Sequence, residues 1–294
     1  MTSSPNRKSA NALQSRDRGT EVVDENEKTS VVARLQSLNP KRLVALYRSF
    51  LENYCRYASS ASNQDKLLKV LQYSLLMIAR FWLQKRGRRS GALTKLSGEI
   101  NWARYILRFL GLPAALEAAR SGSWAKSSVL GKAMAWSMIL YYPLEYAAYL
   151  RWQAPGVLTT SPLYSDKGLA AKASALSCGF WAAYIVLDSA RGMITLSNIQ
   201  SDSKEGGVPE DDQERSRDHE CRMERLQLVR NACFLLPSVH WSLPKWDTDP
   251  WLPADLVNVL MWLESVVCLG QSVVQQRYTN SLLVEGEDTK EKEE

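Results

Sequence analysis

The hydrophobic positions between residues 65 and 110 fall into two helix-length patterns, separated by the basic segment 85–89. In the second pattern, apolar residues recur at steps of three and four, which places them on one side of a helix. This apolar stripe consists of Leu93, Leu96, Ile100, Ala103, Leu107 and Leu110. The opposite side carries Ser97, Asn101, Arg104 and Arg108. The flank between the two sides carries Trp102, Tyr105 and Phe109. The pattern predicts an amphipathic helix, suited either to a membrane interface, with its arginines toward anionic phosphates, or to the surface of a soluble bundle.

The first pattern, residues 65–84, is more apolar. Its wide hydrophobic arc contains Leu67, Leu68, Val70, Leu71, Leu75, Met77, Ile78, Phe81 and Trp82. A narrow polar strip contains Asp65, Lys66, Lys69, Arg80 and Gln84. Such a wide arc requires cover on more than one side, from neighbouring helices or from lipid. Because Lys69, Gln72 and Arg80 would lie within the depth of a bilayer, we predict an embedded or packed helix and not a simple span.

Three further apolar runs follow, at residues 129–150, 170–187 and 252–274. Pro143 and Glu145 interrupt the first, and a proline inside a helix is tolerated in membrane bundles. The uncharged core of the second run is about 15 residues, or roughly 22 Å, which is shorter than a typical hydrocarbon thickness of about 30 Å. We therefore expect the first two runs to form a helical hairpin that is embedded at least part way. The number of membrane crossings stays open.

Acidic residues inside apolar runs need a partner or a proton. Glu145 lies in the first run and Glu264 in the last. We expect Glu145 to face protein, as a buried polar anchor between helices and not as a transport or catalytic group.

The hydrophilic stretches divide the chain into five parts. Residues 1–38 read as a disordered leader, and residues 201–220 as a charged disordered linker. Amphipathic helices and the embedded hairpin occupy 39–200, the C-terminal helices occupy 221–277, and an acidic tail occupies 278–294. The predicted fold class is an all-α, membrane-embedded helical bundle with amphipathic interfacial helices.

Charge is distributed unevenly over this plan. Residues 1–120 hold 21 Lys and Arg against 9 Asp and Glu, whereas the remainder holds 16 against 22. Electrostatic attraction therefore favours binding of residues 1–120 to a negatively charged surface. The long apolar runs of this part favour anionic lipid over nucleic acid as that surface.

The sequence offers little material for catalysis or for a cofactor. The five cysteines are scattered without zinc or redox spacing, and the two histidines do not suffice for a triad or a metal site. No phosphate-binding glycine loop follows a predicted strand. We expect no enzymatic activity, no metal and no cofactor.

Five segments, in this order, resemble the peroxisomal biogenesis factor 11 family. They are Asp65-Lys66-Leu67-Leu68-Lys69-Val70-Leu71-Gln72-Tyr73, then Asn101-Trp102-Ala103-Arg104-Tyr105-Ile106-Leu107-Arg108-Phe109, then Tyr141-Tyr142-Pro143-Leu144-Glu145-Tyr146, then Leu228-Val229-Arg230-Asn231-Ala232-Cys233, and Ser238-Val239-His240-Trp241-Ser242-Leu243. The resemblance covers residues 40–275 and is that of a diverged, fungal-type member.

This resemblance implies a peroxisomal membrane protein that elongates the membrane before fission, controls peroxisome number, and self-associates or recruits fission factors. It assigns membrane remodelling to the basic amphipathic helix, which corresponds here to Lys95, Trp102, Arg104, Arg108 and the apolar stripe. Two other classes stay open. A channel or transporter for small solutes would use Glu145, Asp255 and Glu264, whereas a soluble all-α interaction protein would need no lipid.

Overall fold

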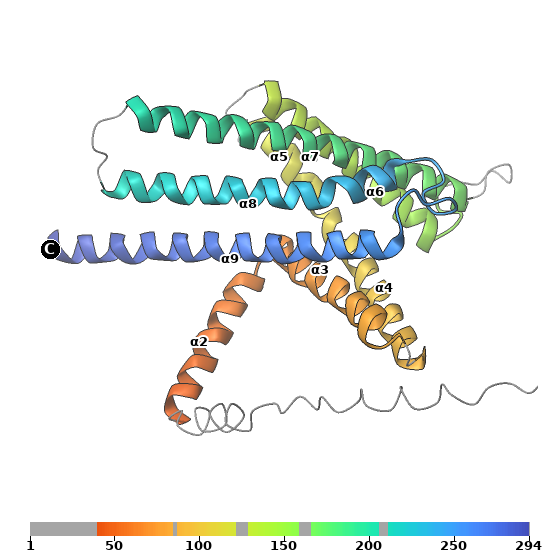
Figure 1. The fold of residues 1–294 in the computed structure, drawn as a ribbon, viewed down its shortest axis with the longest axis horizontal. Helices are drawn as coiled ribbons and strands as arrows, with labels where there is room; N and C mark the ends of the chain where they lie inside the picture. Colours follow the sequence, from red (N-terminus) through yellow and green to blue (C-terminus); the bar gives the residue numbers. More distant parts are fainter. Residues whose placement is uncertain (1–39, 85–86, 122–128, 159–165, 206–210, 294) are drawn as a thin grey trace, which may run out of the picture. The chain divides into compact units, whose positions relative to one another are not determined.

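The structure is a computed structural model that describes residues 40–84, 87–121, 129–158, 166–205 and 211–293 (Figure 1). Within these ranges every regular element is a helix, which confirms the predicted all-α class. The elements are α2 (Pro40–Ala58), α3 (Ala61–Met77), the π-helix η1 (Ile78–Trp82), α4 (Gly87–Phe109), α5 (Gly111–Ser121), α6 (Val129–Gln153), α7 (Asp166–Glu205), α8 (Asp211–Ser242) and α9 (Ala254–Glu293). The predicted leader, 1–38, lies outside the described residues.

The chain divides into two compact units, residues 1–56 and 57–294. Within the first unit, α2 is an amphipathic helix with an exposed apolar side. That side carries Val44, Tyr47, Phe50, Leu51 and Tyr54. Arg48 and Glu52 pair at 3.7 Å elsewhere on the helix surface. No described residue of the first unit covers the apolar side.

Local sequence explains where the helices of the second unit begin and bend. Ser60 caps α3 by accepting a hydrogen bond from the Asn63 backbone N–H at 3.4 Å. Gly111 begins α5, directly after the turn residue Leu110 that follows α4, and lies so close to Tyr142 that a Cβ there would stand 2.4 Å from ring atom Cζ. Pro143 and Pro237 lie inside α6 and α8 without ending either helix.

The prediction of a disordered linker at 201–220 is wrong for most of that segment, because the structure is helical there. Helix α7 continues to Glu205, and α8 already begins at Asp211; residues 206–210 lie outside the described part of the chain. The start of α8 is helical because it packs on α9. His219 stacks on the Tyr278 ring at 3.7 Å between centroids and contacts Gln275 at 3.0 Å.

Six helices of the second unit follow one another around a closed circuit. Contacts join α3 to α4, α4 to α6, α6 to α7, α7 to α8, α8 to α9, and α9 back to α3. Figure 1 shows α7, α8 and α9 lying side by side as the three long helices of this circuit. The polar side chains described next lie where helices of this circuit contact one another.

Candidate functional site

Helix α4 has the two sides that the sequence predicts, but its polar side faces inward. Ser97 and Arg104 are 2% and 5% exposed, whereas Leu96 and Leu110 are 49% and 59% exposed. The expectation that Arg104 and Arg108 face phosphates is therefore wrong in this structure. The physical reason is that carboxylates on other helices neutralise both guanidinium groups, as the next two clusters show.

The first cluster joins α4 to α3. Arg104 Nε donates to Asp65 Oδ1 at 2.8 Å, and Arg104 Nη1 donates to Gln72 Oε1 at 2.7 Å. Ser97 Oγ donates to the Gln72 carbonyl oxygen at 3.2 Å. Asp65 and Gln72 of α3 thus satisfy Arg104 and Ser97 of α4, as buried polar groups must be satisfied.

The second cluster joins α4 to α6. Arg108 Nη1 contacts Glu145 and donates to the Tyr141 hydroxyl at 3.2 Å. The Arg108 guanidinium also lies 4.6 Å from the centroid of the Tyr105 ring. Glu145 is 8% exposed and lies against Arg108 of α4.

The third cluster lies among α3, α8 and α9. Glu264 is fully buried and forms ion pairs with Lys69 and with Arg230, whose Nε lies 2.9 Å from Glu264 Oε1. The Lys69 ammonium also lies 4.1 Å from the centroid of the Phe234 ring. Lys66, on the same polar strip, donates to Ser272 Oγ of α9 at 3.0 Å. Sequence reasoning named neither partner of Glu264, although Arg230 is the single charged residue within 226–239.

A fourth cluster joins α7 to α8 and was missed altogether. Arg191 pairs with Asp188 and with Glu224, each at 3.0 Å. The other Asp188 oxygen accepts hydrogen bonds from Gln227 at 2.7 Å and from Asn231 at 2.9 Å. The available signal was the pair of opposite charges, three residues apart, that ends the apolar run 170–187.

Except for Tyr73, the remaining predicted residues are exposed or half-buried in the second unit. Lys95 and Leu71 are exposed, and Tyr73 is buried. The half-buried residues are Leu67, Leu68, Leu93, Ile100, Trp102 and Leu107. Trp102 packs against an aromatic group that consists of Tyr105, Tyr149 and Trp152. The apolar stripe of α4 is thus only partly covered by protein.

Close to the end of α8, His240 supports the corner that leads to α9. The His240 ring is buried, and its Nδ1 accepts a hydrogen bond from the Leu252 backbone N–H at 3.1 Å. Burial lowers the pKa of His240 below its ordinary value. Among the described residues, no group of three His, Cys, Asp or Glu side chains is arranged to hold a metal ion.

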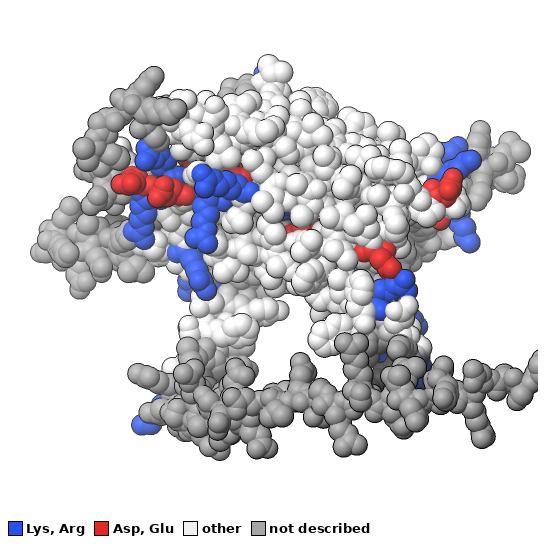
Figure 2. Space-filling view, viewed as in Figure 1, with Lys and Arg blue, Asp and Glu red and all other residues white. Residues whose placement is uncertain are grey.

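The interior of the protein is therefore unusually polar, while many large apolar side chains are exposed. Among the described residues, 14 polar or charged residues are buried beside 15 buried hydrophobic ones, while 30 large hydrophobic residues are exposed. Figure 2 shows charged side chains gathered toward the two ends of the second unit, with an almost uncharged surface between them on the face in view. Exposed apolar surface on this scale marks contact with a membrane or with another protein.

Two helices of the described chain are long and apolar enough to cross a membrane, judged by length and composition. The two segments are Lys167–Ser201 in α7 and Ala254–Ser281 in α9. The run 129–150, which forms most of α6, is not one of them, because its tyrosines, Pro143 and Glu145 lower its hydropathy. Buried ion pairs, exposed apolar side chains and two long apolar helices together define the class: an all-α helix bundle whose apolar surface is compatible with contact with a membrane.

Comparison with known proteins identifies the family within this class. The family model of peroxisomal biogenesis factor 11 (PEX11) matches residues 51–252. The match covers more than half of the chain, and the chain belongs to this family, as its five segments indicated. Searches of curated proteins and of solved structures found no match. Members of the family are peroxisome biogenesis factors associated with the peroxisomal membrane, and membership supports a role in peroxisome proliferation.

Proposed function

We propose that this protein is embedded in the peroxisomal membrane and remodels it, so that peroxisomes elongate, divide and increase in number, without an enzymatic step. The observation that supports this most directly is the pairing of a charged interior with an apolar exterior. Exposing leucine, isoleucine and tryptophan side chains to water costs free energy, and contact with lipid acyl chains removes that cost.

The apolar stripe of α4 is the proposed wedge. Leu96 and Leu110 on the stripe are exposed, and Ile106 and Phe109 extend the exposed apolar surface along the same helix. Inserting this surface into one leaflet expands that leaflet relative to the other and bends the membrane. The embedded long helices hold the wedge at a high local concentration. Helix α2, with its exposed apolar side, is a second interfacial element in this proposal.

Partners follow from the same surfaces. We propose anionic lipids as the ligands of exposed basic residues, because Arg104 and Arg108 are already neutralised inside the protein. Self-association through exposed apolar helix faces, such as Val186, Met193 and Ile194 of α7, would align several wedges on one membrane. Recruitment of membrane fission machinery is the remaining part of the proposal.

The test places charges on exposed residues of the apolar stripe and leaves the buried residues unchanged. Leu96→Glu/Leu110→Glu places two charges on the apolar surface, and Thr94→Glu places one on an exposed position off the stripe. Expressed as full chains in cells that lack their own copy, the wild type and Thr94→Glu are expected to restore peroxisome number and elongation. The double variant is expected to reach peroxisomes but leave them few and round. Normal elongation with the double variant would rule out the α4 wedge.

A channel for small solutes is a second candidate function, because charged side chains lie between the helices. A conducting path would have to pass Glu145 and Glu264, both of which are engaged in ion pairs. Solute flux through planar bilayers that contain the purified chain, reduced by Glu264→Gln, would favour this candidate over remodelling.

A further inference from the structure

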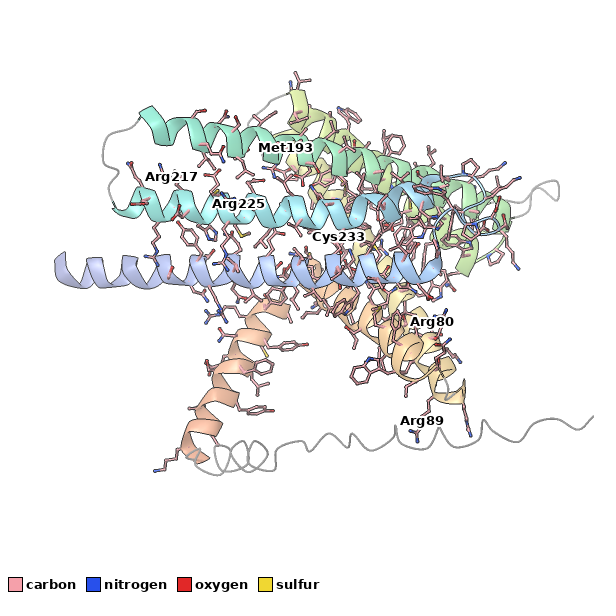
Figure 3. All side chains as sticks on the ribbon, viewed as in Figure 1. Arg80, Arg89, Met193, Arg217, Arg225 and Cys233 are labelled. Carbon is pink, nitrogen blue, oxygen red and sulfur yellow. The ribbon has the colours of Figure 1, made fainter. Side chains whose placement is uncertain are left out.

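The turn between α3 and α4 exposes large apolar side chains next to basic ones. Trp82 is 84% exposed, Phe81 56% and Ile78 41%. Arg88 and Arg89, at the start of α4, are exposed as well. We call these five residues the α3–α4 tip. Figure 3 shows Arg89 near the end of the helix pair formed by α3 and α4.

The apolar residues of the tip lie on the π-helix η1, Ile78–Trp82. The Leu83 N–H donates to the Ile78 carbonyl oxygen at 3.1 Å, five residues back, which is the π-helical pattern. Ala79 is 2% exposed, and its carbonyl oxygen accepts a hydrogen bond from Ser90 Oγ of α4 at 3.0 Å. The exposed rings therefore project from an ordered element, and π-helical turns in α-helices are frequent at functional sites.

An ion pair fixes the tip next to the beginning of α9. Arg80 donates two hydrogen bonds to Asp255 Oδ2, at 3.0 Å from Nε and 2.8 Å from Nη2 (Arg80 is labelled in Figure 3). Asp255 is the second residue of the candidate membrane span Ala254–Ser281. Trp251, just before this span, is 57% exposed. The tip thus lies level with one end of a candidate span, where tryptophan side chains collect in membrane proteins.

The positive charge of the tip indicates that it contacts a negatively charged surface. Arg88, Arg89 and Lys95 are exposed on the first part of α4, where Glu99 is the first acidic residue. Exposed cations beside exposed aromatic rings match a bilayer interface in which headgroups carry negative charge and acyl chains begin below them.

We infer that the α3–α4 tip is an anchor that binds anionic phospholipid headgroups through Arg88 and Arg89 and inserts Phe81 and Trp82 among the upper acyl carbons. The inference rests on the membrane embedding in the proposed function. It assigns a lipid-selecting role to the tip, which is separate from the wedge on the α4 stripe.

The experiment detects which lipid touches the tip in the full chain. Phe81→p-benzoylphenylalanine supplies a photo-crosslinker of similar shape, and the purified chain is reconstituted in nanodiscs of phosphatidylcholine with an added share of phosphatidylglycerol. After irradiation, mass spectrometry is expected to find lipid adducts at residue 81 enriched in phosphatidylglycerol over its share in the disc. The same crosslinker at Glu214, an exposed position at the charged start of α8, is expected to give no lipid adduct.

Charge variants separate binding by the tip from general attraction. Arg88→Glu/Arg89→Glu is expected to reduce the phosphatidylglycerol enrichment at residue 81 by about fivefold or more. Arg222→Glu/Arg225→Glu makes the same change of net charge on exposed residues of α8 and is expected to leave the enrichment unchanged. Arg88→Gln/Arg89→Gln serves as the milder form if charge reversal disturbs the hairpin.

Several outcomes would overturn the inference. They are the absence of lipid adducts at residue 81, adducts without preference for phosphatidylglycerol, and adducts only to a second protein chain, which would make the tip a protein interface. The outcome is independent of peroxisome counts. A chain that forms the expected adducts but does not restore peroxisome elongation would refute the proposed remodelling function and leave the anchor standing.

Discussion

At the scale of single residues, Glu264 is the buried charge whose ion pairs contribute most to the stability of the fold. It is a fully buried carboxylate between two cations, Lys69 and Arg230, on two other helices. Removing one member of such a group leaves uncompensated charge in a medium of low dielectric constant, which costs far more than losing an exposed ion pair.

We expect Glu264→Ala to lower the free energy of unfolding by about 3–5 kcal/mol, because Lys69 and Arg230 lose their carboxylate. The matched control is Glu117→Ala, which removes the exposed pair with Arg120 on α5 and is expected to cost less than about 1 kcal/mol. Thermal unfolding of both purified chains in the same detergent measures the difference. Equal losses for the two variants would contradict the assignment of a buried triad.

His240 makes the corner between α8 and α9 sensitive to pH. Because burial lowers its pKa, the folded chain keeps the ring neutral at a pH where the unfolded chain already protonates it. The stability contributed by the neutral ring is therefore present above the ordinary histidine pKa of about 6.5 and is lost as the pH falls below it.

We expect this part of the acid sensitivity to disappear in His240→Asn, whose side-chain oxygen can accept the Leu252 N–H without titrating. The measurement is the difference in melting temperature between wild type and variant, followed from neutral to mildly acidic pH. His219→Asn, at an exposed contact, is the control and is expected to keep the wild-type dependence. A constant difference between His240→Asn and wild type across this range would show that His240 does not titrate as described.

At the scale of elements, α4 shows what a sequence pattern can and cannot predict. The spacing of Leu96, Ser97 and Arg104 predicts a helix with two sides, and the structure has that helix. Which side is covered depends on Asp65 and Glu145, which lie on other helices, and this information is not local. The same limit applies to 201–220, where polar composition suggested a linker but packing on α9 supports a helix.

Two glycines of the α4–α5 region allow a matched pair of substitutions. Gly111→Ala is expected to lower the free energy of unfolding by about 1–3 kcal/mol, because its Cβ would collide with the Tyr142 ring. Gly98→Ala has no atom within 4 Å and is expected to raise it by up to about 1 kcal/mol through helix propensity.

Unfolding of both single variants in detergent measures these effects, and a double-mutant cycle tests the cause. In a Tyr142→Ala background the cost of Gly111→Ala is expected to shrink. If the cost were the same in both backgrounds, the close contact between Gly111 and Tyr142 would not be its origin.

At the scale of the whole molecule, the second unit buries several ion-paired charges between its helices and exposes many large apolar side chains. The family resemblance and the all-α class were accessible from the sequence because they depend on segments in a fixed order. The closed circuit of helices was not, because it joins α3 to α9 across almost the entire second unit.

We expect the full chain, expressed in cells, to stay in the membrane pellet after alkaline carbonate extraction and to coincide with a peroxisomal matrix marker. Lipid contact with the apolar surface resists carbonate, which removes proteins held by charge alone. A soluble matrix protein in the same fractions serves as the control for release. Recovery of the chain in the supernatant would favour the soluble interaction protein instead.

The closed circuit also sets an order of events during synthesis. Helix α9 emerges from the ribosome after α3 and α8, yet it carries Glu264, the carboxylate that neutralises Lys69 on α3. Until α9 is made and docks, Lys69 and Arg230 lack this counter-charge, and α3 lacks one wall of its packing. The circuit therefore closes only after α9 has emerged, and a nascent chain that stops before α9 holds two uncompensated cations that favour water over lipid.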